Sequence, residues 1–233
     1  MDTRYLREIG TVGLVSGVLL VVLNLLHPVG NTELYGDGVK FMAKMDTFWV
    51  ILHLVIAVTL LPVPMVVQAW VGTLSTERAR VWGNFSLMLI VMGTVIGLIH
   101  IAGIDGVALP AFGNLLQASG GSPELRVVAA ALLKVHLATF ISWVIVFWMA
   151  GQAVLAFATF LDPQQPRALA VAAALGAAFA LASVLTTALA GQLTTFSEGG
   201  LFRPSTVGFT VFYLWISLRL RRSQTVTAAT AAV

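Results

Sequence analysis

The stretch NFSLMLIVMGTVIGLIHIAGI, residues 84–104, decides the fold class of this chain. It contains no Asp, Glu, Lys or Arg, and about 20 apolar residues are enough for a helix to cross the hydrocarbon core of a bilayer. The stretch therefore predicts a membrane-spanning helix. Its one histidine, His100, falls near the end of that helix.

The composition of the whole chain points to the same class. The 233 residues are 58% hydrophobic and only 10% charged, with a mean hydropathy of +0.94, whereas soluble domains carry about 25% charged residues. No basic run suggests a nucleic-acid partner. The absence of cysteine excludes disulfides and thiolate metal sites. We therefore expect a multi-pass membrane protein in contact with lipid.

Six apolar runs predict an all-α bundle of six transmembrane helices that forms a single domain over residues 1–233. The runs cover residues 9–28, 48–73, 84–104, 128–160, 167–194 and 204–220. No cleavage-site pattern follows the first run, so we expect it to be a retained helix and not a signal peptide. Residues 221–233 are expected to form a disordered tail.

The distribution of Lys and Arg predicts the orientation in the cell membrane. Eight of these residues lie at the N-terminus, in the loops after the second and fourth spans and at the C-terminal end, and five lie on the other side. Because cytoplasmic loops carry an excess of Lys and Arg, both termini are expected to be cytoplasmic.

A short phrase recurs in the chain. LLHPVG at residues 25–30 ends the first span, LIHIAG at residues 98–103 ends the third, and the span after each contains His-Leu and a later Met-x-x-Gln-Ala. This pattern predicts that helices 1–2 and 3–4 are tandem copies of one helical hairpin with the same orientation. Chance matches in apolar sequence are the alternative.

The repeat distributes the histidines over the first four helices, each in the outer third of its span. They are His27, His53, His100 and His136. Neutral imidazole binds zinc, copper and iron, and it is an axial ligand of haem. Ligands on facing helices of a bundle converge in its interior. The pattern therefore predicts a site for a transition metal (copper, iron or zinc) or a b-type haem.

Two carboxylates are near these histidines in sequence. Asp46 precedes His53, and Asp105 follows His100 in the phrase GIDG. A carboxylate that accepts the far N–H of a ligating imidazole fixes the orientation of the ring. We expect Asp46 and Asp105 to act in this way or as catalytic proton acceptors. Separate interfacial histidines with local hydrogen bonds are the alternative.

These residues favour a metal- or haem-dependent membrane oxidoreductase that acts on a small or lipophilic substrate near the outer face. The same histidines would also suit an ion- or proton-coupled transporter or sensor, and an accessory subunit of a membrane complex would need no site at all. Transport predicts a polar path inward from the histidines, where helices 1 and 3 offer little beyond Ser16, Asn24 and Thr94. The Ala- and Gly-rich fifth span predicts close helix packing, within the chain or in a homo-oligomer.

Overall fold

The computed structural model describes residues 2–27, 47–191 and 200–222, and these residues contain helices and no strand. Five helical segments are long and apolar enough to cross a bilayer. They are Thr3–Leu26, Thr47–Val71, Glu77–Ala118, Pro123–Leu161 and Arg167–Ala190. The predicted all-α class is therefore confirmed, and the fold is that of a multi-pass membrane protein.

Most of the segments are divided into shorter helices. In chain order, the helices of the described residues are α1 (Thr3–Leu26), α4 (Thr47–Leu60), α5 (Val63–Val71), α6 (Glu77–Leu98), η1 (Ile99–Ala108), α7 (Leu109–Ala118), α8 (Pro123–Trp143), η2 (Val144–Gly151), α9 (Gln152–Leu161), α10 (Arg167–Ala190) and α11 (Arg203–Arg222). The segments η1 and η2 are π-helical and continue the α-helices on either side of them.

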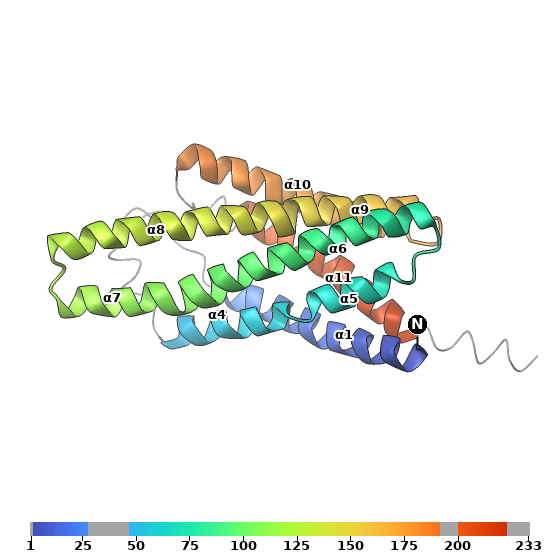
Figure 1. The fold of residues 1–233 in the computed structure, drawn as a ribbon, viewed down its shortest axis with the longest axis horizontal. Helices are drawn as coiled ribbons and strands as arrows, with labels where there is room; N and C mark the ends of the chain where they lie inside the picture. The colour runs from blue at the N-terminus through green and yellow to red at the C-terminus, as the bar shows by residue number, and fades with distance from the viewer. Residues whose placement is uncertain (1, 28–46, 192–199, 223–233) are drawn as a thin grey trace, which may run out of the picture.

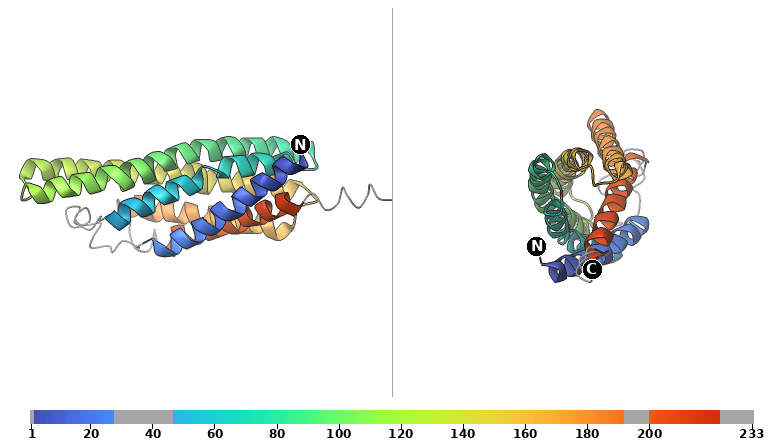
Figure 2. Two further views of the ribbon diagram at one scale, coloured as in Figure 1. Left: turned by 90° about the horizontal axis from the view of Figure 1, so that it is seen from below. Right: turned by 90° about the vertical axis from the view of Figure 1, so that its right-hand side faces the viewer.

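The two longest rods run side by side in opposite directions. One rod is α6, η1 and α7, and the other is α8, η2 and α9 (Figure 1). Their α7–α8 end projects beyond the other helices, which is also plain from a second side (Figure 2). The N-terminus lies at the opposite end of the bundle.

The third and fourth helices extend well beyond the predicted spans 84–104 and 128–160. Only residues 119–122 lie between the end of α7 and the start of α8. Gly120 and Gly121 adopt positive φ angles of 65° and 76°, which stop α7. Ser122 then caps α8 by accepting a hydrogen bond from the Leu125 amide. A connector rich in Gly and Ser thus needs only four residues to reverse the chain.

Two other boundaries also differ from the predictions. The second span is interrupted after Leu60, and α5 begins at Val63, where Pro62 and Pro64 cannot donate backbone hydrogen bonds. Residues 221–222, expected in the tail, complete the last turn of α11. Residues 223–233 lie outside the described part of the chain.

Small residues bring the backbones of α10 and α11 together. A Cβ atom added to Gly208 would lie 2.8 Å from the Ala172 carbonyl oxygen and 2.9 Å from the Gly176 Cα atom. In lipid, such close approach replaces the hydrophobic effect as the main source of helix association.

Candidate metal centre

Four histidines and one aspartate from four different elements meet inside the bundle. Asp105 Oδ1 lies 2.9 Å from His136 Nε2. Asp105 Oδ2 lies 3.4 Å from His100 Nε2 and 3.8 Å from His53 Nε2. His27 Nε2 lies 3.1 Å from His53 Nε2. The structure therefore brings five of the six predicted site residues together, and Asp46 lies outside the described residues.

The π-helical segment η1 explains why His100 and Asp105 share one face. Residues five apart in an α-helix point about 140° away from each other. In a π-helix the hydrogen bonds join residues five apart, so His100 and Asp105 become neighbours. The segment η2 has the same effect on Trp143 and Trp148, which both line the cavity beside the centre.

Hydrogen bonds orient two of the imidazole rings. His53 Nδ1 lies 2.8 Å from the Trp49 carbonyl oxygen, which can only accept, so Nδ1 carries the proton. His100 Nδ1 lies 3.0 Å from Thr139 Oγ1. The Thr139 hydroxyl donates to backbone carbonyls of its own helix and therefore accepts from His100. In both rings the Nε2 lone pair faces the centre, as is usual for metal-binding histidines.

The His27 ring is placed by the end of α1. His27 caps this helix with φ −65° and ψ 118°, an extended conformation. This is the conformation that the following proline favours. This preference explains why α1 ends at Leu26, two residues before the end of the predicted span at residue 28.

Trp49 links α4 to the segment that carries Asp105. Its indole N–H donates to the Asp105 carbonyl oxygen at 2.9 Å, and its ring stacks on His53 with centroids 4.4 Å apart. Gly106 lies beside this contact, and a Cβ atom added there would lie 3.1 Å from the Ile101 carbonyl oxygen, which is closer than an ordinary contact.

The centre is almost completely buried. His53, His100, Asp105 and His136 are each at most 6% exposed. Burying ionisable groups is costly unless they are paired or bind a metal. The ligand atoms of His100, Asp105 and His136 all lie within 4.8 Å of one another. One metal ion could contact all three, and nitrogen and carboxylate oxygen suit iron, zinc or copper.

A cavity of about 110 Å³ adjoins the centre. The four histidines and Asp105 contribute to its lining. Five further aromatic residues also line it, namely Trp49, Phe140, Trp143, Trp148 and Phe202. Arg203 is also at the cavity, and its guanidinium donates a hydrogen bond to the His27 carbonyl oxygen. Asn24 donates to the Thr206 hydroxyl in the same wall.

Sequence reasoning missed several of these residues. Thr139 and Arg203 were not predicted because their roles depend on contacts between helices far apart in the chain. Asp105 was expected to orient an imidazole, yet its carboxylate lies among the imidazole nitrogens themselves. An acidic side chain at the end of an apolar run was the available signal, since ionisable groups there are functional candidates by default. Comparison of the chain with protein-family models, with curated proteins and with solved structures finds no significant match.

Proposed function

We propose that this chain is an integral membrane metalloprotein whose ion is held by His100, Asp105 and His136, with His53 as a further ligand. The ion would serve an oxidoreductase acting on a small or lipophilic substrate in the adjoining cavity. The observation that carries the proposal is the buried group of three ligand atoms within 4.8 Å of one another.

The donor set favours non-haem iron over the other candidates. Two imidazoles and one carboxylate with open coordination positions are the ligands of non-haem Fe(II) oxygenases, and an additional imidazole would also suit zinc. A b-type haem is less well supported, because the imidazoles converge on a carboxylate and the cavity of about 110 Å³ is far smaller than a porphyrin. Bound iron would supply electron transfer or activation of oxygen.

The chain's own groups would prepare the centre for this ion. The Trp49 carbonyl and the Thr139 hydroxyl hold the protons of His53 and His100 on Nδ1, so that each Nε2 atom is available as a ligand. His27, next to His53, is placed to accept or return a proton during turnover. The aromatic side chains at the cavity limit the access of water.

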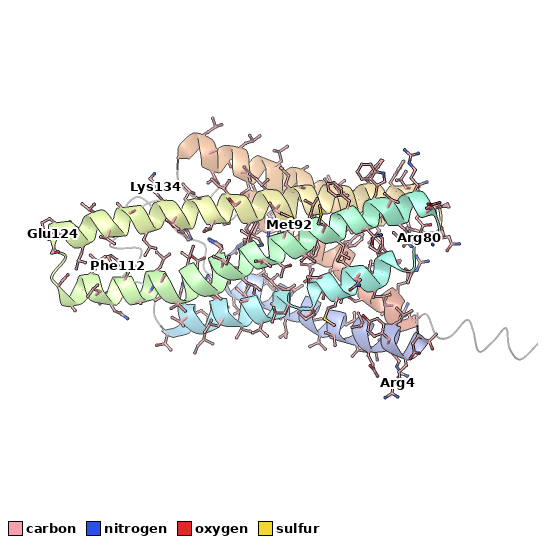
Figure 3. All side chains as sticks on the ribbon, in the orientation of Figure 1. Arg4, Arg80, Met92, Phe112, Glu124 and Lys134 are labelled. Atoms are coloured by element: carbon pink, nitrogen blue, oxygen red, sulfur yellow. The ribbon has the colours of Figure 1, made fainter. Side chains whose placement is uncertain are left out.

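We further propose that α11 is a sixth span and that both termini are cytoplasmic. Arg4 and Arg80 lie toward one end of the bundle and Glu124 lies at the other (Figure 3), as the excess of arginine inside predicts. From Arg80 to His100 is 20 residues, about 30 Å at the rise of an α-helix. The centre would then lie near the outer boundary of the membrane core.

The tandem repeat also remains a proposal, supported by the arrangement of the ligands. α1 and α4 provide His27 and His53, and the next two rods provide His100 and His136. Each pair of helices would thus contribute two imidazoles to one centre. α10 could in addition join two copies of the chain through its exposed apolar side chains, such as Val171, Leu175 and Phe179.

A titration tests the metal site. Tag-free protein in detergent would be titrated with Fe²⁺ and Zn²⁺ against a chromophoric chelator. We expect about one ion per chain, and Asp105→Asn and His136→Gln should each weaken binding at least about 100-fold because each removes a ligand. Glu124→Gln, which changes an exposed carboxylate, is the control. Unchanged affinity in both ligand variants would contradict the proposal.

A second function, proton-coupled transport, is favoured by one observation. Hydroxyl groups continue from the cavity along the interface of α1 and α11. Thr206 and Thr210 line the cavity, Ser16 and Tyr213 share a hydrogen bond of 2.9 Å, and Ser217 follows one turn later. Tyr213→Phe should slow proton uptake into proteoliposomes if this path conducts. An unchanged rate would remove the support for transport.

A further inference from the structure

The cavity beside the centre has features that a metal site alone does not need. Its wall combines five aromatic side chains, besides the histidines, with Arg203. We propose that it binds a small amphiphilic carboxylate, with the carboxylate between the bound ion and Arg203 and the apolar body against the aromatic side chains. This inference rests on the proposed metal site and names the class of its substrate.

The volume limits the size of the apolar body. The cavity measures about 110 Å³, somewhat less than the apolar cavity of about 150 Å³ that accepts benzene in another protein. A tail of about five carbons would fill this space, and further methylene groups would lie outside it.

The aromatic wall is rigid as well as apolar. Trp143 and Trp148 meet edge to face with ring centroids 5.6 Å apart, and Phe202 contacts Phe140 at 5.2 Å and Trp148 at 5.5 Å. Edge-to-face pairs of this kind hold one another in place. The wall therefore offers a preformed surface to an apolar body, which reduces the entropy lost on binding.

Arg203 provides the matching group for an anion. It is the one Lys or Arg among the described residues that line the cavity, and no carboxylate in the described part of the chain pairs with it. Its bond to the His27 carbonyl uses one of five guanidinium N–H groups. The guanidinium fork matches a carboxylate well, and a metal ion at the centre would add positive charge to the cavity.

Arg203 can also be reached from outside the bundle. It lines a second, shallow groove between α10 and α11, together with Gly176, Phe179 and Val207. Arg203 thus borders both the inner cavity and an apolar outer groove. An amphiphile dissolved in the bilayer could reach the cation from that groove, head group first.

The test uses pentanoate as the probe and zinc as a redox-inert ion. Binding to the zinc-loaded protein would be followed by calorimetry and by tryptophan fluorescence. Pentanoate should bind at least about tenfold more tightly than pentan-1-ol or pentylamine, since only the carboxylate pairs with Arg203. Decanoate should bind no more tightly than pentanoate, because the cavity is already full. Affinity that rises with every added methylene would indicate partition into detergent and overturn the inference.

Variants distinguish a failure of the carboxylate site from a failure of the metal site. Arg203→Gln should weaken pentanoate binding at least about tenfold, Arg203→Lys should retain part of it, and the exposed Arg78→Gln should change nothing. Zinc stoichiometry is measured in the same samples. A zinc-loaded Arg203→Gln protein that binds pentanoate like the wild type would overturn this inference alone. Failure of the wild type to bind zinc would overturn the proposed function.

Discussion

At the scale of single residues, the centre depends on acceptors that fix each ring. His53 and His100 both direct Nδ1 away from the centre, one to a backbone carbonyl and one to a hydroxyl. The sequence predicted the four imidazoles because histidine is rare in apolar spans and chemically specific. It did not predict Thr139, because one threonine among many on these helices carries no signal of its own.

The Thr139 hydroxyl therefore provides a sharp test of ring orientation. Thr139→Val removes the acceptor from His100 and keeps the side-chain shape, so the affinity for Fe²⁺ or Zn²⁺ should fall about 10- to 100-fold. Thr139→Ser should restore most of the affinity. Ser142→Ala, which removes an exposed hydroxyl one turn away, serves as the control. Equal affinity in the Val and Ser variants would show that the hydrogen bond does not orient the ring.

Asp162 lies just after α9, and its carboxyl group should make the stability of the fold depend on pH. Burial would raise the pKa of its carboxyl group, but hydrogen bonds from the hydroxyl and amide of Ser75 and from the Gln164 amide outweigh burial and lower the pKa below its usual range. The carboxylate thus stabilises the fold fully above the pKa of an unfolded Asp, about 4. This contribution is lost as the pH falls through the lower folded pKa.

Thermal unfolding in detergent measures this effect. The wild type should melt at a higher temperature than Asp162→Asn near pH 6, and the gap should close progressively below pH 4. A gap that stays constant or widens in acid would contradict the assigned role of the carboxylate. Ser75→Ala should melt at a temperature between those of the wild type and Asp162→Asn, because the amides of residue 75 and Gln164 still donate hydrogen bonds to the carboxylate.

At the scale of the elements, the π-helical segments produce the parts of the site that sequence reasoning could not place. Apolar runs predict where a helix lies, and the positions of the histidines within those runs predicted that the four rings form one layer. Such runs do not predict where an α-helix changes to a π-helix. That change brings His100 beside Asp105 and Trp143 beside Trp148.

The close packing of η2 on α6 leads to a prediction for Gly93. A Cβ atom added to Gly93 would lie 2.5 Å from the Phe147 Cβ atom and 2.8 Å from its Cα atom, so Gly93→Ala must separate the two rods. We expect a loss of about 1–3 kcal/mol in the free energy of unfolding. Gly103→Ala is the matched control, since no atom lies within 4 Å of its added Cβ. A Gly93 variant as stable as the Gly103 variant would contradict the packing.

At the scale of the whole molecule, composition predicted the all-α membrane fold, and loop chemistry was the weaker guide. The predicted spans 84–104 and 128–160 were shorter than the two long rods, which are joined by residues 119–122 alone (Figure 1). The sequence predicted a sixth span at residues 204–220, yet α11 is not among the five segments that are long and apolar enough to cross a bilayer. Arg203 and three arginines in its last turn lower the mean hydropathy of this helix.

The cysteine-free chain makes the proposed topology directly measurable. Single cysteines would be introduced at Thr3, Ser119, Gln164 and Arg222, all exposed, and intact cells would be treated with a membrane-impermeant maleimide. Only the cysteine at position 119 should react before lysis. Labelling at position 222 but not at position 3 would show that α11 does not cross the membrane.

The central claim is that the buried histidines and Asp105 hold a transition-metal ion. X-ray absorption spectroscopy on the tag-free protein as purified tests it most directly, because one spectrum reports both the metal and its ligands. We expect an edge from one first-row metal, with iron the first candidate, and nitrogen and oxygen neighbours at about 2.0–2.2 Å, imidazole scattering and no sulfur. The absence of a metal edge above background, or an ion surrounded by water without imidazole, would show that these residues do not hold a metal ion.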